Sequence, residues 1–308
     1  MTGSHENAIS LPRYERPLEV PTPPAPLADG EFVPYDELDR ALASASLTEG
    51  GRDLLRGLLR LGRTAMFAGG GAGIEYGSLL KTAARPKYIA AHVREAAAHL
   101  QEQRVDLLVV PGMSGYPVGS MYAIVSGIPA VLLKKQRHAP DGLYPPGSFL
   151  IPSYTGDHDV VMSADLAATQ DIVDEILSAQ LAAQADAETL AFTLRVAGAD
   201  DIIDKATMSQ AVSESAMIVG SAAIARFAAR HRALTGDHRP VTESVEVVAW
   251  VTPLIKGYNG PHEHLRRWFG ITPFAGLNVT SLHLEPCAIG VEGIGVVGFA
   301  EAGVEDDD

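Results

Sequence analysis

The hydrophobic pattern in the middle of the chain predicts two strands joined by a helix. Residues Val105–Val110 form an apolar run, as is typical of a strand buried on both faces of a parallel sheet. A glycine-containing loop and a short helical segment closed by Gly127 come next, and a second apolar run follows at Pro129–Leu133. A strand, a helix and a strand in so few residues predict a right-handed βαβ unit of a parallel sheet.

Helical periodicity dominates the residues before this unit. We expect a first helix at residues 35–47 and a second at residues 49–62. The second carries an apolar stripe made of Leu54, Leu55, Leu58, Leu59 and Leu61. Residues 85–103 form an amphipathic pattern, and Pro86 suits the first turn of that helix.

The residues after the unit fall into several patterns. Residues 134–154 are polar and rich in Pro and Gly, which predicts a long mobile loop leading into a strand. Residues 171–198 predict a short strand, an acidic pair and a long helix that ends at Gly198. A further helix is expected at residues 213–236, and residues 244–301 are β-rich and punctuated by Gly.

These patterns predict an α/β fold with a parallel-sheet core and an added C-terminal segment. Residues 1–30 contain many prolines, which fix φ and lack an N–H donor, so we expect a flexible arm there. Residues 31–200 are expected to form the α/β core. Residues 201–308 are expected to be helical and then β-rich, and to cover the functional site.

Composition limits the classes of function that the chain can have. The 308 residues are 46% apolar, which is enough for a substantial core, and the formal net charge is −14. That charge argues against a general nucleic-acid or anionic-membrane binder, because both partners need a basic face. No stretch is long and apolar enough to span a bilayer. The single cysteine, Cys287, fits a reducing compartment, so we expect a cytoplasmic protein.

The loop after the first strand has the composition of an anion-binding loop. Its sequence from Gly112 to Pro117 is Gly-Met-Ser-Gly-Tyr-Pro. The carboxyl end of a parallel strand is the usual position of a ligand loop. Glycines let the backbone approach a ligand closely, and successive N–H groups with a following helix N-terminus attract an anion. An ordinary strand-to-helix turn is the alternative interpretation.

A cluster of basic residues follows the second strand of the unit. Lys134, Lys135, Arg137 and His138 create a local positive charge in an acidic protein, and lysine is a competent point charge for phosphate. The alternative is a solvated start of a loop.

Asp174 and Glu175 form an adjacent acidic pair at the end of the apolar stretch that begins at residue 171. Two adjacent carboxylates at the end of a buried strand need a compensating partner, and a hard cation with ligand oxygens is a natural one. The alternative is a pair of acids at a helix N-terminus, where the helix dipole favours them.

Two further segments carry weaker signals. Phe67–Lys81 is rich in glycine, but it does not fit the pattern of a nucleoside-triphosphate loop. His262 and His264 form a His-x-His pair, which alone is weak evidence for a metal, and a surface loop is the preferred interpretation.

The order of these parts resembles the type I phosphoribosyltransferases, especially the orotate phosphoribosyltransferase-like branch. In that family a strand carries a pyrophosphate loop, matched here by PGMSGYP, and the next strand ends in basic residues, matched by LLKKQRH. A flexible catalytic loop with a β-hairpin follows, and then a strand ending in an acidic pair, matched by IVDEILSAQ. The segment EYGSLLK also looks like the residues before the first long helix of that branch. The resemblance covers roughly residues 67–198.

The resemblance implies roles for particular residues. It implies catalytic roles for Asp174, Glu175, Lys135 and Arg137, with the two acids also holding Mg²⁺. The residues that it implies in substrate binding are Pro111, Gly112, Met113, Ser114, Gly115, Tyr116, Lys134, His138, Lys81 and Ser178. It also implies a homodimer.

One part of the family pattern is missing at the matched position. After the acidic pair the family has a run like Ala-Thr-Gly-Gly-Thr, which wraps the 5-phosphate of phosphoribosyl pyrophosphate. Residues 178–182 here read Ser-Ala-Gln-Leu-Ala, so the 5-phosphate loop is degenerate there. A competing alignment places residues 163–171 at that loop, which keeps Asp165 and Thr169 but also lacks the glycines. Another segment, such as Gly69–Gly73, could hold the phosphate instead.

Three functional hypotheses follow from this pattern. The first is an enzyme that transfers a phosphoribosyl group from phosphoribosyl pyrophosphate to a small heterocyclic acceptor, with Mg²⁺ and release of pyrophosphate. The second is an enzyme on the same fold with altered chemistry on a phosphorylated or nucleoside-like metabolite. The third is a non-catalytic ligand sensor. The lost phosphate loop separates the first hypothesis from the second, and turnover separates both from the third.

Overall fold

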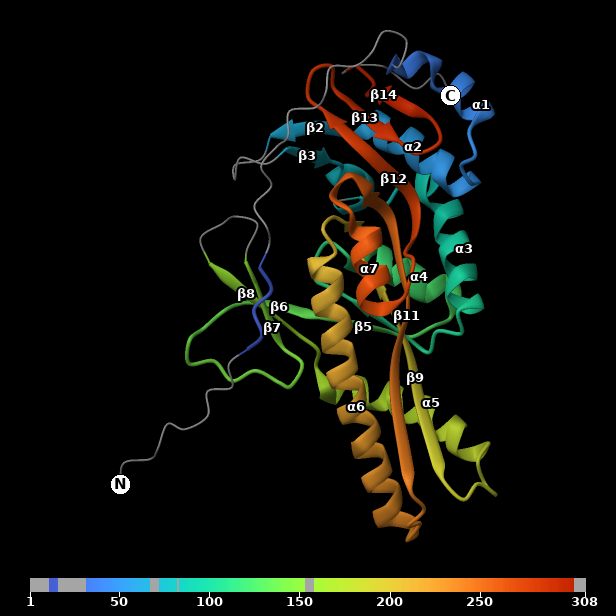
Figure 1. Ribbon diagram of the computed structural model, residues 1–308, viewed down its shortest axis with the longest axis vertical. Helices are drawn as coiled ribbons and strands as arrows, with labels where there is room; N and C mark the ends of the chain where they lie inside the picture. The colour runs from blue at the N-terminus through green and yellow to red at the C-terminus, as the bar shows by residue number, and fades with distance from the viewer. Residues whose placement is uncertain (1–10, 16–31, 67–71, 82, 153–157, 302–308) are drawn as a thin grey trace.

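A computed structural model describes residues 11–15, 32–66, 72–81, 83–152 and 158–301 (Figure 1). Most of the predicted arm therefore lies outside the described residues, and so does most of the glycine run that could have held a phosphate. The same applies to the side chain of Lys81.

The described residues form one large, mostly parallel sheet. Its strand order is β1 (Phe32–Val33), β14 (Gly295–Gly298), β13 (Ala288–Val291), β12 (Phe274–His283), β11 (Val241–Lys256), β9 (Leu190–Ala199), β4 (Leu107–Val110) and β5 (Ala130–Leu132), with β10 (Ile202–Ile203) paired to the end of β11. Only β13 pairs with its two neighbours in the antiparallel direction. The predicted α/β class is confirmed.

Helices cover both faces of this sheet (Figure 1). The helices are α1 (Leu38–Ser44), α2 (Glu49–Leu61), α3 (Pro86–Glu102), α4 (Tyr116–Ser126), α5 (Leu166–Ala182), α6 (Thr207–Thr235) and α7 (Pro261–Phe269). Alternate residues of β4 enter two separate cores, because successive side chains of a strand point to opposite faces. Leu108 and Val110 pack with α2, α3 and α4, whereas Leu107 and Val109 pack with α5 and α6.

Several predicted elements are present at the expected positions. The βαβ unit is formed by β4, α4 and β5, and Gly127 ends α4 in a left-handed conformation with φ of 74°. Pro86 begins α3, and the leucine stripe of α2 is buried. The C-terminal segment is helical at α6 and then β-rich, as expected. Its strands continue the same sheet as the core, since β11 pairs with β9 across the expected boundary at residue 200.

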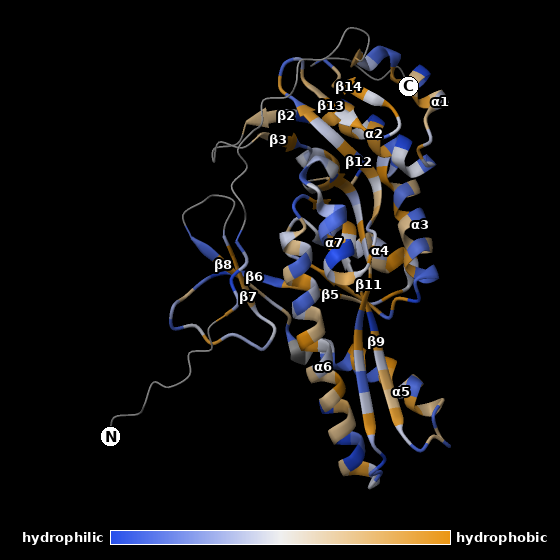
Figure 2. Cartoon of the chain, viewed as in Figure 1, coloured by the Kyte–Doolittle hydropathy of each residue, from blue (hydrophilic) through white to orange (hydrophobic). Residues whose placement is uncertain are grey.

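The prediction for residues 171–198 was wrong. Residues 172–175 belong to α5, and the second half of the stretch is strand β9. Val173 and Leu177 are buried one helical turn apart, so the apolar residues before Ala182 follow a helical period. From Leu190 to Val196, buried and more exposed residues alternate, which is the strand period. Figure 2 shows β9 coloured by hydropathy.

Glutamine side chains of α5 cover the edge of the N-terminal part of β9, before residues 196–198, where β4 pairs with the strand. The Gln180 amide bonds both the N–H and the carbonyl oxygen of Thr193, at 3.1 and 2.6 Å. The Gln184 amide does the same at Ala191, at 2.7 and 2.8 Å. These amides occupy the positions that a neighbouring strand would otherwise take.

Two smaller sheets accompany the main one in the described part of the chain. Strands β6 (Lys134–Arg137), β8 (Asp159–Ser163) and β7 (Phe149–Pro152) form a separate antiparallel sheet, so the residues expected as a loop include two strands. Residues 11–15 lie along β7, where the Leu150 N–H donates to the Pro12 carbonyl at 2.9 Å. Strands β2 (Arg63–Met66) and β3 (Ala72–Glu75) form a hairpin, and the single turn η2 (Gly77–Lys81) follows it.

Helix α6 is long and apolar enough to cross a membrane by length and composition alone, the one such helix among the described residues. The sequence pattern predicted a helix there but no stretch of that length and hydropathy. In its most apolar window 56% is buried inside the protein. Its buried residues, including Ile224 and Phe227, belong to the same core as β9. This packing is typical of a core helix.

Candidate functional site

The carboxyl ends of four parallel strands bring separate loops to one edge of the sheet. β4 leads into residues 111–115, β5 into residues 133–135, β9 into residues 200–206 and β11 into the turn η3 (Gly257–Asn259). Open α/β sheets bind ligands at this edge. The candidate site is therefore defined by these loops.

The β4 loop is held against its neighbours by close backbone contacts. The Tyr116 hydroxyl donates to the Leu133 carbonyl at 2.5 Å, which ties the loop to the exit of β5. A Cβ at Gly112 would lie 2.7 Å from the same carbonyl oxygen. A Cβ at Gly115 would lie 2.8 Å from the Pro111 carbonyl oxygen. A side chain at either position would collide with these backbone atoms, so the two glycines allow the loop to pack closely on the protein. The close approach of this backbone to a ligand stays a prediction.

Asp200 and Asp201 follow the last residue of β9 and were missed by the sequence analysis. Both are buried, with exposed fractions of 9% and 2%. The Asp201 N–H donates to Asp200 Oδ1 at 2.9 Å, and a Cβ at Gly115 would lie 2.9 Å from that same oxygen. An acidic pair thus lies against the β4 loop, which is the arrangement predicted for Asp174 and Glu175. Recognising the strand period of residues 190–196 would have found it.

The loop after this pair leads into the N-terminus of α6. Asp204 pairs with Lys256 Nζ at 2.9 Å and accepts a hydrogen bond from the Asn259 amide. Ala206 is the N-cap residue, with φ of 60° in the left-handed region that favours glycine. Thr207 begins the helix, whose first N–H groups have no acceptor within the helix. This loop therefore contains the Asp204 carboxylate and also leads to backbone N–H groups of α6 that can donate to an anion.

The predicted basic cluster is spread along β6. Lys134 pairs with Asp165 at 2.8 Å, and the ring of His138 stacks on that of Tyr144. Alternation along the strand places Lys135 and Arg137 on the face opposite Lys134. All three cationic side chains of the strand are exposed. The cluster therefore extends from the β5 exit along the small sheet instead of converging on one point.

Asp174 and Glu175 lie in the middle of α5, away from the strand end that was expected. Asp174 accepts hydrogen bonds from Arg230 Nη2 of α6 at 2.6 and 2.8 Å, whereas Glu175 is exposed. The Ser178 hydroxyl donates back to the Asp174 carbonyl at 2.6 Å and is also exposed. The premise that placed these residues beside the β4 loop is wrong, because they lie within a helix, where Asp174 meets α6 and Glu175 and Ser178 are exposed.

An open pocket of about 440 Å³ lies at the same sheet edge. Its lining residues are Arg13, Tyr14, Glu15, Lys205, Thr207, Gln210, Asn259, His264 and Trp268. The rings of His264 and Trp268 stack with centroids 5.1 Å apart. Burial and the neighbouring Glu214 carboxylate raise the pKa of Tyr14, whose hydroxyl donates to Glu214. A small-molecule site is commonly of this size and mixes aromatic with polar residues.

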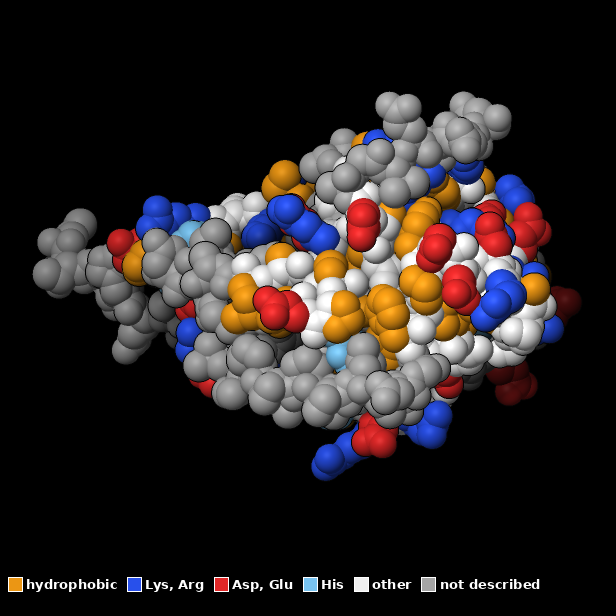
Figure 3. Space-filling model, turned by 90° about the horizontal axis from the view of Figure 1, so that it is seen from above, with side chains coloured by type: hydrophobic (Ala, Val, Ile, Leu, Met, Phe, Trp, Pro, Cys, Tyr) orange, Lys and Arg blue, Asp and Glu red, His pale blue; other side chains and the backbone are white. Residues whose placement is uncertain are grey.

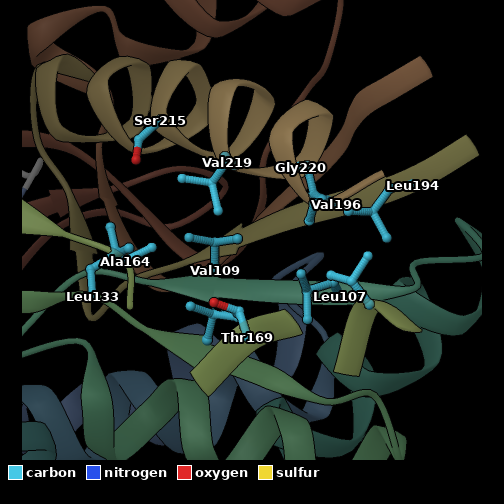
Figure 4. Close-up of a pocket in the computed structure, with 14 residues that line it drawn as sticks. Leu107, Val109, Leu133, Ala164, Thr169, Leu194, Val196, Ser215, Val219 and Gly220 are labelled. Atoms are coloured by element: carbon cyan, nitrogen blue, oxygen red, sulfur yellow. The ribbon is translucent and has the colours of Figure 1, made fainter. Parts of the chain in front are cut away.

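A second, much smaller cavity lies inside the core between the sheet and α6 (Figure 4). Its volume is about 20 Å³, and aliphatic side chains such as Val109, Val131 and Val219 line most of it. The Ser215 hydroxyl is buried there without a partner. This space has about the volume of one water molecule and is too small for a substrate.

The donor atoms at the site suit a cation that arrives with a ligand. Among the described residues no group of three or more His, Cys, Asp and Glu side chains could hold a metal ion. Mg²⁺ is usually bound by one or two carboxylates together with substrate phosphates, and Asp200 beside the β4 loop fits that pattern. Asp174 does not fit it, because Arg230 already pairs with its carboxylate.

Charge on the surface is mixed. On the face seen from above, Lys and Arg side chains are interspersed with acidic and apolar ones in the part that the structure describes (Figure 3). The expectation that the chain does not bind nucleic acid stays a prediction from its net charge.

No protein-family model and no curated protein matches the chain. Similar solved structures include adenine phosphoribosyltransferases from Thermoanaerobacter pseudethanolicus, with 13% identity and a TM-score of 0.43 over 72% of this chain and 97% of that one. The enzyme from Giardia lamblia, complexed with 9-deazaadenine, has 13% identity and a TM-score of 0.44 over 72% and 96%. The one from Leishmania tarentolae has 13% identity and a TM-score of 0.40 over 74% and 88%. Similarity this low carries no argument about activity.

Proposed function

We propose that the chain is a phosphoribosyltransferase-type enzyme that transfers a ribosyl phosphate group from phosphoribosyl pyrophosphate to a small heterocyclic acceptor. The observation that carries the proposal is the contact of Gly115 in the β4 loop with Asp200 at the end of β9. An anion-binding loop and an acidic pair at adjoining strand ends can hold the two halves of one ligand, pyrophosphate and sugar hydroxyls. The family resemblance of the β4 loop and the following basic strand supports the same assignment.

Each loop has a distinct part in the proposed reaction. The N–H groups of residues 112–115 hold the pyrophosphate, and the β6 lysines screen its charge. Asp200 and Asp201 take the place first assigned to Asp174 and Glu175, on the ribose hydroxyls. The N-terminus of α6 with Thr207 holds the 5-phosphate, where Ala206 keeps the left-handed conformation of a glycine. Mg²⁺, when bound with the donor, would neutralise charge on the pyrophosphate.

The bond changes balance within donor and acceptor. A ring nitrogen of the acceptor forms a bond to the anomeric carbon, and the bond from that carbon to pyrophosphate breaks with its electron pair on the leaving oxygen. The acceptor ring loses its N–H proton to the departing pyrophosphate or to water. The chain contributes by holding the reacting groups in line. The pocket beside Thr207 is the proposed acceptor side, since the stacked rings of His264 and Trp268 suit a flat heterocycle.

Pyrophosphate release tests this proposal directly. The protein is mixed with phosphoribosyl pyrophosphate, Mg²⁺ and a panel of nucleobases with adenine first, and pyrophosphate is measured with a coupled phosphatase assay. Release that depends on one base supports the enzyme. Tight binding of the donor by calorimetry without release with any base supports the ligand sensor, and absence of both binding and release overturns both.

A second candidate function rests on Asp204. The Asp204 carboxylate already neutralises the charge of Lys256, whose side chain is only 10% exposed. The loop before α6 therefore contains its own anion. A dianionic phosphate placed nearby would be repelled by it. The donor substrate would then carry pyrophosphate but no 5-phosphate. This candidate corresponds to the second hypothesis, an enzyme on the same fold with altered chemistry.

An Asp204→Asn variant separates the two donors. If Asp204 repels a phosphate, the wild-type protein binds Mg²⁺-pyrophosphate but not ribose 5-phosphate, and the variant gains affinity for ribose 5-phosphate by about tenfold. Calorimetry measures both ligands, and circular dichroism confirms that the variant is folded. Equal ribose 5-phosphate affinity in the two proteins would exclude the second candidate.

We also propose a homodimer in the cytoplasm. Ile124 and Val125 of α4 and Leu132 of the terminal strand β5 are exposed together at one end of the sheet. A second copy of the chain that covers this end would remove apolar surface from water and shield the free edge of β5.

An Ile124→Glu variant is expected to convert the dimer into a monomer, because a carboxylate cannot be buried there unpaired. Light scattering coupled to gel filtration measures the mass. Leu234→Glu is the matched control, since Leu234 lies at the end of α6 and both side chains belong to residues that are 81% exposed. A wild-type monomer at high concentration would contradict the dimer.

A further inference from the structure

The two carboxylates after β9 face different surroundings. Asp200 lies against the β4 loop, where its Oδ1 is close to Gly115. Asp201 is buried more deeply and accepts a hydrogen bond from the Tyr76 hydroxyl at 2.6 Å. Asp200 therefore faces the β4 loop, whereas the side chain of Asp201 is held by Tyr76.

Tyr76 reaches Asp201 from a distant part of the sequence. It lies between β3 and η2, is 3% exposed, and belongs to the core formed with α2 and α3. Its hydroxyl donates to a carboxylate away from water, which is the stronger class of hydrogen bond. Rotating the Asp201 side chain would break this bond and leave a buried carboxylate without that donor.

A second tyrosine, Tyr122, lies near the Asp201 carboxylate. Tyr122 of α4 is fully buried, and its hydroxyl pairs with His92 Nε2 at 2.7 Å. Burial first, and the charge of Asp201 second, raise the pKa of Tyr122. Two protonated phenols therefore lie near Asp201, and Tyr76 is the one whose hydroxyl bonds to it.

We propose that Tyr76 is a positioning residue that holds Asp201 in the orientation needed to bind the sugar of the donor. The inference rests on the proposed function, because it assigns the acidic pair to that sugar. The Tyr76 hydroxyl fixes the side chain of Asp201, and the Asp201 N–H fixes the side chain of Asp200. The side chain of Asp201 is thus held by a residue outside the ligand site, and the carboxylate of Asp200 is held separately by a backbone N–H.

The test compares two ligands that differ in the sugar. Phosphoribosyl pyrophosphate carries the sugar that Asp201 is proposed to bind, whereas pyrophosphate with Mg²⁺ lacks it and reaches only the β4 loop and, through the metal, Asp200. A Tyr76→Phe variant is expected to bind phosphoribosyl pyrophosphate about tenfold more weakly and pyrophosphate unchanged. Asp201→Asn is expected to have the same selective effect. Because Tyr76 acts through Asp201, the double variant should bind no more weakly than Asp201→Asn alone.

The controls separate positioning from general destabilisation. Tyr88→Phe removes the hydroxyl of another buried tyrosine, which packs on α2, and should leave both affinities unchanged. Unchanged donor affinity in Tyr76→Phe, equal weakening for both ligands, or multiplying effects in the double variant would overturn the inference while leaving the proposed function intact. A wild-type protein that binds neither ligand would overturn both.

Discussion

An Asp200→Asn variant is expected to release pyrophosphate at least about 100-fold more slowly than the wild-type protein. The substitution keeps an oxygen that can accept the Asp201 N–H, so the local fold should persist. It removes the negative charge beside the β4 loop, and with it the group proposed to hold a sugar hydroxyl or a water molecule on Mg²⁺. The measurement is the steady-state rate with the donor and the base identified by the panel.

Asp174→Asn is the matched comparison, because it makes the same chemical change in the other acidic pair. Asp174 is paired with Arg230 between α5 and α6, so its substitution should change stability slightly and leave the rate within twofold. The opposite outcome, with a large loss at Asp174 and none at Asp200, would restore the site predicted from the sequence. The two variants therefore decide between the two acidic pairs.

The protein is expected to lose about 2 kcal/mol of stability between about pH 7.5 and pH 5 through His92 alone. Burial lowers the pKa of His92 from 6.5 to about 3 in the folded protein. Between these values the unfolded chain binds a proton that the folded protein does not. The folding free energy contributed by the neutral ring is therefore complete above pH 6.5 and falls as the pH decreases toward 3.

Urea unfolding of the wild-type protein and a His92→Gln variant at the two pH values measures this contribution. Glutamine can still bond to the Tyr122 hydroxyl but does not titrate, so the variant should lose about 2 kcal/mol less on acidification than the wild-type protein. Identical pH dependence in both proteins would show that His92 is not the group responsible.

Local sequence signals predicted the β4 half of the site. The apolar run, the glycine loop and the helix closed by Gly127 are adjacent in the sequence, and each has a short-range physical cause. The turn chemistry of the loop needs only its own residues, and β4 is buried on both faces as its composition indicates. Local pattern is therefore sufficient to identify Gly112, Gly115 and Tyr116 as residues of the loop.

The acidic half was misplaced because two local periods were not separated. Residues 171–198 contain a helical and then a strand period, and their interpretation as a short strand followed by a long helix placed the strand end at Asp174 instead of before Asp200. The pocket depends on contacts that no local pattern encodes, since Tyr14 meets Glu214 of α6. Tyr76 is joined to Asp201 in the same way, by packing between distant segments.

The glutamine contacts between α5 and β9 form because four residues of a helix and two residues of a strand cover nearly the same distance. Four residues of a helix advance about 6 Å, and two residues of a strand advance about 6.6 Å. Gln180 and Gln184 therefore meet Thr193 and Ala191 together, and a shift of α5 by one residue would break both contacts at once. The helix is thus held at a single position along the strand that ends next to Asp200.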